Sequence, residues 1–425
     1  MNIAQALQIA QEHLLGRRPA QAAEIARQIL AIDSKNIFAL QTMGLAASVQ
    51  ANHELALEMF QKSIELTLVP TGDQLFFAGE TYRQLMRFDE SIATLERAIS
   101  VLPSHADAHL SLALSLLILG RYERGLDEFE WRWKSTRLNT QRINFAQPTW
   151  DGSDPAGKTI LLWAEQGLGD VMQCMRYAPL LAKRGAKVAI GCQVSLERLL
   201  KTLPDISVVT SRMDGTPPFQ LQMSSFGLMK AFNTTVQTIP QNVPYLFADP
   251  VLSVKWKEKL AGDRARLKVG LVWAGRADNP TDADRSIPLA ALTPLLALKD
   301  VCFYGLQIDD RNPQATVAIG IKPLGDQLTD LAETAAVLDN LDLLISVDTA
   351  PVHLAGAMGK PVWNLIAWFN DWRWMLNRGD SPWYPSMRIF RQKTRGDWKS
   401  VIAEVIEALS VLMLNPSGLS GPPRP

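Results

Sequence analysis

Residues 158–170, KTILLWAEQGLGD, decide the fold of the larger part of the chain. The first seven form a compact apolar run, which is typical of a strand buried on both faces of a parallel sheet. The two glycines that follow allow a tight turn, and a helix is expected from Val171 onward. A buried strand, a glycine-containing turn and a helix together indicate an α/β fold with a parallel sheet.

The same alternation of short apolar runs and helical segments continues through the rest of the chain. Helices are expected at residues 195–202 and 331–340, and further strands at KVAIGC, ISVVTS, FQLQM, LKVGLVWAG, VCFYGLQ, LDLLISVD and PVWNLIA. This order predicts two Rossmann-like domains, at residues 158–250 and 265–412, followed by a disordered tail at residues 413–425.

A cleft is expected between these two domains. Ligands of open α/β sheets bind beyond the carboxyl ends of the strands. The loops that follow Ala164, Ala274 and Val347 should therefore line this cleft.

Residues 1–137 carry an internal repeat with a period of about 34 residues, the length of a helix-turn-helix unit. Small residues recur at two positions of the repeat, Gly44, Gly79 and Ala113 at one and Ala22, Ala56, Ser91 and Gly125 at the other. The segment resembles the TPR family in Gly79-x-x-Tyr82, Ala98 and Pro103, and in GRYERGLDEFEWRW at residues 120–133. Three to four repeats are expected, the first being a degenerate cap, before a linker at residues 138–157.

The repeats are expected to serve protein–protein contacts. Stacked helical repeats build an extended concave surface, which favours a groove for a peptide or protein. A spacer or a dimerisation scaffold is the alternative. The sequence does not identify the ligand of the groove.

The composition argues against several classes of partner. Lysine and arginine number 43, as do aspartate and glutamate, so the chain lacks the positive charge that nonspecific nucleic-acid binding requires. The longest apolar stretch, residues 110–119, is far shorter than the roughly 20 residues of a membrane span, and the N-terminus does not resemble a signal peptide. Cys174, Cys192 and Cys302 are too widely spaced to suggest a metal site or a disulfide framework. We therefore expect no nucleic acid, no membrane span and a cytoplasmic location.

The first candidate site is the turn after the strand at residues 158–164. Gln166, Gly167 and Gly169 form a loop that should face the cleft, where the glycines let backbone N–H groups approach a ligand. Asp170 should project into the cleft from the start of the helix. The alternative is that Asp170 only caps that helix.

The second candidate site is SVDTAPVH, residues 346–353. The strand ends at Asp348, and either Asp348 or Thr349 can cap the next helix, which starts near Ala350. The free N–H groups and dipole of such a helix favour a diphosphate. Capping and packing explain Thr349 well, but they explain His353 less well.

The third candidate site follows the strand that ends at Trp273. Arg276 precedes a polar loop, ADNPTDAD, and Arg285 comes directly after it. A guanidinium group binds phosphate oxygens in a bidentate manner, so the pair suits a phosphate clamp. The alternative is that Arg276 and Arg285 are each an ordinary solvent-exposed surface residue.

Taken together, the three sites resemble glycosyltransferases of the GT-B fold, specifically the ADP-heptose:lipopolysaccharide heptosyltransferase-like family, over about residues 158–410. This resemblance implies an acceptor-side domain at residues 158–250 and a nucleotide-sugar-binding domain at residues 265–412. A Gly-Asp pair after the first strand supplies the family's catalytic aspartate, and Gly169-Asp170 matches it.

The resemblance also covers the donor segment. The family's Asp-Thr-Gly-x-x-His binds the nucleotide of the donor, and it matches Asp348-Thr349-Ala350-x-x-His353. Ala350 replaces the glycine, so the identity of the nucleotide is not carried over. A basic residue before Trp-Pro in the family resembles Arg285, where Ile-Pro stands instead of Trp-Pro.

Over nearly its whole length the chain is similar to bacterial TPR proteins with a heptosyltransferase-like C-terminus. The similarity includes Glu-Gln-Gly-x-Gly-Asp, ending at Asp170, and Asp-Trp-Arg-Trp at residues 371–374. The arrangement also resembles that of the O-linked N-acetylglucosamine transferases, an analogy of architecture alone. The aromatic residues near 368–384 are expected mainly to pack a domain boundary, with stacking on a sugar or base as the alternative.

The resemblance implies transfer of a sugar from a nucleotide-sugar donor to a hydroxyl group of a protein or glycan, by inverting displacement. Asp170 would be the general base, and Arg276, Arg285 and the helix after Asp348 would stabilise the leaving diphosphate. There is no clear Asp-x-Asp after a strand, so neither a metal nor a cofactor is expected. The rival hypothesis is a non-catalytic scaffold with a degenerate or nucleotide-sensing GT-B domain. A sugar-nucleotide epimerase of similar fold is a third option that the repeats do not support.

Overall fold

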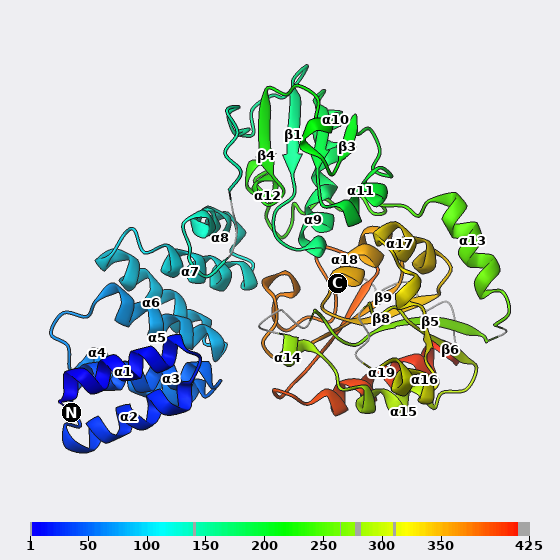
Figure 1. Ribbon diagram of the computed structural model, residues 1–425. Helices are drawn as coiled ribbons and strands as arrows, with labels where there is room; N and C mark the ends of the chain where they lie inside the picture. Colours follow the sequence, from blue (N-terminus) through cyan, green and yellow to red (C-terminus); the bar gives the residue numbers. More distant parts are fainter. Residues whose placement is uncertain (1, 139–141, 264, 277–281, 309–311, 415–425) are drawn as a thin grey trace. The chain divides into compact units, whose positions relative to one another are not determined.

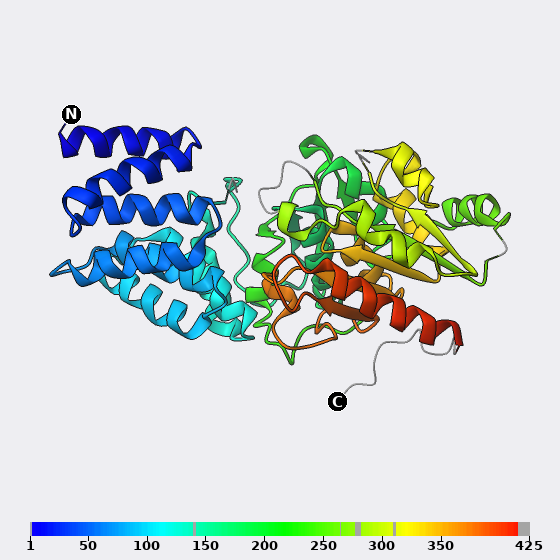
Figure 2. The same cartoon turned by 90° about the horizontal axis from the view of Figure 1, so that it is seen from below.

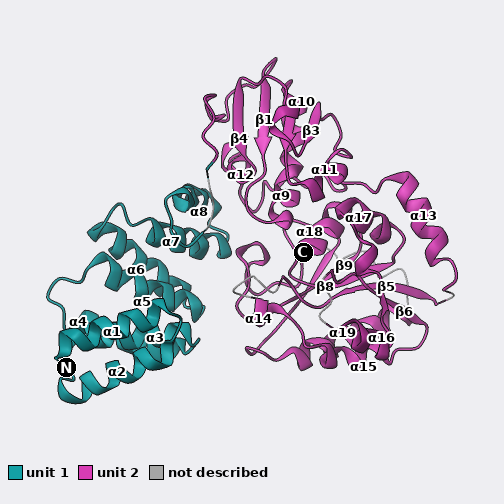
Figure 3. Cartoon of the chain, in the orientation of Figure 1, with its two compact units in different colours: residues 1–142 teal, residues 143–425 magenta. Residues whose placement is uncertain are grey.

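The structure of the chain is a computed structural model that describes residues 2–138, 142–263, 265–276, 282–308 and 312–414 (Figure 1). It divides into two compact units, residues 1–142 and 143–425, which Figure 3 shows in different colours. Helical repeats make up the first unit, and two parallel sheets with surrounding helices make up the second. The predicted fold class is therefore confirmed. None of the helices in the described ranges is long and apolar enough to cross a membrane.

The first unit consists of helical hairpins in which each helix packs against the next. Figure 2 shows them stacked one upon another. The helices are α1 (Ile3–Leu15), α2 (Pro19–Ile32), α3 (Ile37–Val49), α4 (His53–Glu65), α5 (Gly72–Gln84), α6 (Phe88–Val101), α7 (Ala106–Ile118) and α8 (Tyr122–Phe129), with a 3₁₀ turn at Glu130–Trp133. The degenerate first repeat folds as a hairpin like the others.

The recurring small residues lie where two helices of a hairpin approach most closely. A Cβ atom added at Gly44 would lie 2.6 Å from the ring of Phe60, and one at Gly79 would lie 2.7 Å from Leu95. The hydroxyl of Ser91 also donates to the carbonyl of Gly79 at 2.8 Å. Close helix contact therefore explains the repeat signal in the sequence.

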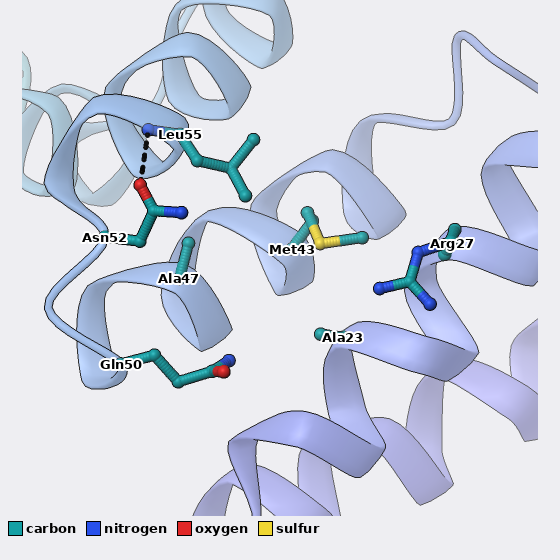
Figure 4. A pocket seen from close by; sticks show the side chains of 7 residues that line it. All are labelled: Ala23, Arg27, Met43, Ala47, Gln50, Asn52 and Leu55. Atoms are coloured by element: carbon teal, nitrogen blue, oxygen red, sulfur yellow. Dashed lines mark hydrogen bonds between the residues drawn. The ribbon is translucent and has the colours of Figure 1, made fainter.

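A small pocket of about 130 Å³ lies in the first unit (Figure 4). Its lining residues come from α2, α3 and the start of α4, and they are Ala23, Arg27, Met43, Ala47, Gln50, Asn52 and Leu55. The amide of Asn52 caps α4 by accepting from the N–H of Leu55 at 3.3 Å. Both apolar and polar side chains therefore line the pocket.

The second unit contains a four-stranded sheet of order β3-β2-β1-β4 and a six-stranded sheet of order β10-β9-β8-β5-β6-β7. All neighbouring strands are parallel. The first sheet comprises β1 (Thr159–Trp163), β2 (Lys187–Gly191), β3 (Val208–Thr210) and β4 (Leu221–Ser224). The second comprises β5 (Leu267–Val272), β6 (Val301–Gly305), β7 (Lys322–Pro323), β8 (Leu343–Val347), β9 (Val362–Ile366) and β10 (Met387–Arg391). The strands expected from the sequence are all present, and β7 and β10 were not foreseen.

Helices cover both sheets. They are α9 (Leu168–Cys174), α10 (Ala178–Lys183), α11 (Val194–Leu200), α12 (Gly227–Ala231), α13 (Pro250–Leu260), α14 (Asp282–Arg285), α15 (Thr293–Leu296), α16 (Pro313–Ala318), α17 (Leu331–Asp339), α18 (Ala350–Ala357) and α19 (Trp398–Leu414). The two halves of the unit are in contact where α9 packs on α18 and where α11 packs on α17 (Figure 1). The carboxyl ends of β1 and β8, which lead into α9 and α18, are thereby brought together.

Three boundaries differ from the expectations. The helix expected from Val171 begins at Leu168, because Asp170 occupies its first turn and bonds back to the N–H of Gly167. The polar loop before Arg285 ends in the short helix α14, while residues 277–281 lie outside the described ranges. The expected tail overlaps α19, which buries Leu412 and ends at Leu414; residues 415–425 are not described.

Replacing Gly79 by alanine should destabilise the first unit, although alanine favours helices. The added methyl group would lie 2.7 Å from Leu95, and we expect overpacking to cost about 1–3 kcal/mol. Urea unfolding followed by circular dichroism measures this loss. Gly262→Ala, where nothing lies within 4 Å of the added atom, is the matched control. Equal stability of the two variants would contradict the explanation of the repeat.

Candidate functional site

The loop after β1 meets the start of α18. A Cβ atom at Gly169 would lie 2.6 Å from the ring of His353, so the two backbones approach closely at this point. Glycine is the residue that permits such an approach. The first and second candidate sites, far apart in the sequence, therefore lie side by side.

Asp170 lies at this junction, and both of its carboxylate oxygens are engaged. One accepts from the N–H of Gly167 at 2.9 Å, and the other accepts from Nη2 of Arg373 at 2.5 Å. The side chain of Asp170 keeps 23% of its surface exposed. Burial raises the pKa of this carboxyl, Arg373 opposes the rise and the nearby Asp371 adds to it. Asp170 thus closes the turn at Gly167 and also pairs with Arg373, which belongs to the half of the unit that contains the six-stranded sheet.

The guanidinium of Arg373 occupies the centre of the site. Its side chain is only 6% exposed, and it donates to Asp170, to Asp371 at 2.8 Å and to the amide oxygen of Gln173. The pKa of Arg373 is raised, because the attraction of Asp371 and Asp170 outweighs the opposing effect of burial. The central guanidinium carbon of Arg373, Cζ, lies 5.3 Å from the centre of the ring of Phe226, which follows β4. Arg373 therefore ties the six-stranded half of the unit to the carboxyl edge of the four-stranded sheet.

The residue after Arg373 reaches the second candidate site. The indole N–H of Trp374 donates to Oδ2 of Asp348 at 2.8 Å. Burial, together with the negative charge of Asp371, raises the pKa of Asp348 to about 6, although the bond from Trp374 opposes this shift. The consecutive residues Arg373 and Trp374 thus bond to the carboxylates of Asp170 and Asp348, respectively.

The first turn of α18 differs from the expectation in one respect. Thr349 stands at the N-cap position, but its hydroxyl makes no capping bond and instead donates to the carbonyl of Val347 at 3.2 Å. The alternative that Thr349 caps this helix is therefore wrong, because the side chain turns back to the strand. Ala350 begins the helix, and Asp348 accepts the bond from Trp374.

His353 lies inside the site as a neutral group. It is buried, and its Nδ1 lies 2.9 Å from the hydroxyl of Tyr384. Burial and the positive charges of Arg373 and Arg176 hold the pKa of His353 well below its usual range. An uncharged imidazole in contact with Gly169 therefore lines the junction of α9 and α18.

A second buried arginine, Arg176, also crosses between the halves of the unit. It donates to the carbonyls of Trp383 at 2.9 Å and Pro240 at 3.2 Å, and to the hydroxyl of Tyr245 at 3.3 Å. Trp383 and Tyr384 are fully buried around it. This arrangement agrees with the packing role expected for the aromatic segment.

The third candidate site reaches Asp348 through Arg285. Nη1 of Arg285 donates to the backbone carbonyl of Asp348 at 3.1 Å, and Nε lies 3.5 Å from Asp282. A Cβ atom at Gly275 would lie 2.3 Å from the same guanidinium, so a side chain there would displace Arg285 from this position. Arg276 is exposed and directly precedes residues 277–281, which are outside the described part.

The cleft loop is strained at Gln166, which has a φ of 63°. Its carbonyl accepts from the amide of Gln193, after β2, at 3.4 Å. The side-chain nitrogen of Gln166 and the side-chain oxygen of Gln193 are buried without a hydrogen-bond partner. Gly167 is exposed, and its N–H is directed to Asp170.

The sequence does not predict the contribution of Arg373 and Trp374. Their segment is similar to other proteins, but its aromatic residues are expected mainly to pack a domain boundary. A charged residue between two tryptophans was the available signal, but the sequence does not say which carboxylate it meets. Among the described residues, no group of three or more His, Cys, Asp and Glu side chains is arranged to hold a metal ion.

Residues 327–401 match the family model of glycosyltransferase family 9 (heptosyltransferase). The chain carries a glycosyltransferase family 9 domain. The match includes Asp348, His353, Arg373 and Trp374, but it does not reach Arg276 and Arg285. Enzymes of family 9 use nucleotide sugars as donors.

The chain is also similar to individual proteins. Protein FlbA from Caulobacter vibrioides (strain ATCC 19089 / CIP 103742 / CB 15) is 25% identical over 426 residues, which cover 92% of this chain and 70% of that protein. Among solved structures, the crystal structure of MamA is 22% identical and covers 31% of this chain and 75% of that one, with a TM-score of 0.29. YrrB, described as a TPR protein with an unusual peptide-binding site, is 18% identical over 32% of this chain and 70% of its own, with a TM-score of 0.29.

The raised pKa of Asp348 should make stability depend on pH. Folding raises this pKa from 3.8 to about 6, so the native state binds the proton more tightly than the unfolded state. The stabilisation is complete below about pH 4 and is lost as the pH rises through about 6. Asp348→Asn should remove this part of the pH dependence.

Urea unfolding between pH 4 and pH 8 tests this prediction. Asp205→Asn, at an exposed position of the same unit, is the matched control and should follow the original chain. If the two variants showed the same change of unfolding free energy with pH, the environment described for Asp348 would be wrong.

Proposed function

We propose that the protein transfers a sugar from a nucleotide-sugar donor to a hydroxyl group of a protein or glycan acceptor. The observation that carries this proposal is the junction of α9 and α18, where Asp170 of one half of the unit lies beside the donor segment of the other. A transferase needs its base and its donor site at such a short separation, because the acceptor oxygen attacks the anomeric carbon between them.

Asp170 is the proposed general base. The acceptor hydroxyl would lose its proton to a carboxylate oxygen as the new glycosidic bond forms, and the nucleoside diphosphate would leave from the opposite face with inversion. Burial raises the pKa of Asp170, which makes it a stronger base than a surface aspartate. Arg373 is a positioning residue, because its bond at 2.5 Å fixes the orientation of the carboxylate.

The leaving diphosphate is proposed to lie at the start of α18. The N–H groups of Thr349 and Ala350, the helix dipole and the guanidinium of Arg285 would together stabilise its negative charge. Arg276 would reach the same phosphates from the end of β5. These groups supply positive charge from the protein itself, so we propose a reaction that requires neither a metal nor a cofactor.

The repeats are proposed to recruit the acceptor. Their hairpins form a stacked array, and such arrays present a continuous concave surface to peptides and proteins.

One observation favours a second function, that of a non-catalytic scaffold. Both oxygens of Asp170 are engaged within the chain, by Gly167 and by Arg373. A carboxylate that serves only to close a turn and hold two halves together would show the same contacts.

Two substitutions separate binding from catalysis. Arg285→Ala should weaken binding of a nucleoside diphosphate about 10-fold to 100-fold, as expected for the loss of a charged hydrogen bond of about 1.5–3 kcal/mol. Asp170→Asn should leave this binding unchanged and lower the rate of transfer by about 10²–10⁴, the usual contribution of a general base.

Calorimetric titration with UDP, GDP, ADP and CMP measures the first effect, and release of the diphosphate from the matching sugar nucleotide measures the second. Arg266→Ala, an exposed arginine before β5, is the control for loss of charge. Absence of binding to every nucleotide by the folded chain would favour the scaffold, and undiminished transfer by Asp170→Asn would refute the assignment of the base.

A further inference from the structure

The segment that follows the last helical hairpin folds back onto two helices of the first unit. Ser135 and Thr136 both bond to Asp107, at the start of α7. The hydroxyls of Ser135 and Thr136 donate to its carboxylate at 2.5 and 3.0 Å, and the N–H of Thr136 donates to it at 3.2 Å. One carboxylate thus accepts hydrogen bonds from two side chains and one backbone group of this segment.

Arg137 continues the same contact onto a second helix. Its guanidinium donates to the hydroxyl of Ser111 on α7 at 2.7 Å and to Glu80 on α5 at 2.9 Å. It also lies 5.8 Å from the centre of the Phe76 ring on α5. The side chain keeps 35% of its surface exposed, so it lies on a face of the helices and not in their core.

This face belongs to the first helices of two successive hairpins. α5 opens one hairpin, α7 opens the next, and the two helices contact each other directly. In stacked repeats, the first helices of successive hairpins line the concave surface. Residues 135–137 therefore lie where a peptide ligand of the repeats would be expected.

The carboxyl of Glu80 is held in its negatively charged form at this face. Burial alone would raise the pKa of its carboxyl, but Arg83 and Arg137 hold that pKa far below its usual range. Arg83 bonds to both oxygens of Glu80, at 2.6 and 3.0 Å, and belongs to the same helix. Glu80 would thus stay paired if Arg137 left, so Arg137 is a second cation that the folded helices do not require.

We propose that the α5–α7 face is a binding site for an arginine-containing peptide segment, and that residues 135–137 occupy it as an internal ligand. The face supplies the carboxylates of Glu80 and Asp107, the hydroxyl of Ser111 and the ring of Phe76. An arginine with neighbouring hydroxyl side chains satisfies all of them, because guanidinium pairs with carboxylates and lies over aromatic rings.

The internal ligand competes with any external one. A tethered segment has a high effective concentration at its own site, so a free peptide of the same sequence binds weakly while the tether is in place. Release of residues 135–137 opens the face to a partner protein. This inference concerns the repeats alone and does not rest on the proposed transfer reaction.

A labelled peptide with the sequence KSTRL, that of residues 134–138, tests the proposal in the full-length chain by fluorescence anisotropy. Arg137→Ala should bind this peptide about tenfold more tightly than the original chain, since an internal charged contact no longer competes. Adding Asp107→Asn to Arg137→Ala should weaken the binding again. Arg142→Ala, which removes an exposed arginine five residues further on, should bind like the original chain.

Thermal unfolding followed by circular dichroism verifies that each variant folds. A peptide in which alanine replaces the arginine should bind no variant. Equal affinity of the original chain and Arg137→Ala for KSTRL would overturn the proposal, as would equal binding of the peptide that lacks arginine. The segment would then be a structural support for the end of the repeats.

Discussion

The buried guanidinium of Arg373 is the interaction on which the site depends. A charge that is 6% exposed is stable only if carboxylates compensate it, and Asp170 and Asp371 do so from opposite halves of the second unit. Removing Asp170 would leave the buried guanidinium with Asp371 as its remaining paired carboxylate. The position of Asp170 relative to the start of α18 is therefore tied to this contact, and Trp374, the next residue, bonds to Asp348.

The same constraint sets the charge of the neighbouring groups. Three carboxylates, Asp170, Asp371 and Asp348, lie around one guanidinium, so burial and mutual repulsion raise the pKa of Asp170 and Asp348. Burial, together with the positive charges of Arg373 and Arg176, lowers the pKa of His353, which stays neutral. The site therefore combines two carboxyls of raised pKa with a neutral imidazole around one buried guanidinium.

The sequence predicted what depends on local pattern. The sequence predicts buried strands such as β1 and β8 because nearly every position in them is apolar, and it predicts the repeats because Gly44 and Gly79 lie at close helix contacts. β10 was missed because MRIFR carries two arginines in an edge strand, and the pairing of Arg373 with Asp170 was missed because 203 residues separate them. Contacts over such distances depend on how the two halves pack, and no local pattern encodes that packing.

A double-mutant cycle between Arg373 and Asp170 tests the account most directly. The unfolding free energies of Arg373→Met, Asp170→Asn and the double variant would be measured by urea denaturation of the full-length chain. Residues in direct contact should show a coupling energy of about 1–3 kcal/mol, with the double variant less destabilised than the sum of the single ones. Effects that add within about 0.5 kcal/mol would show that the two side chains do not depend on each other, and would contradict the central role of Arg373.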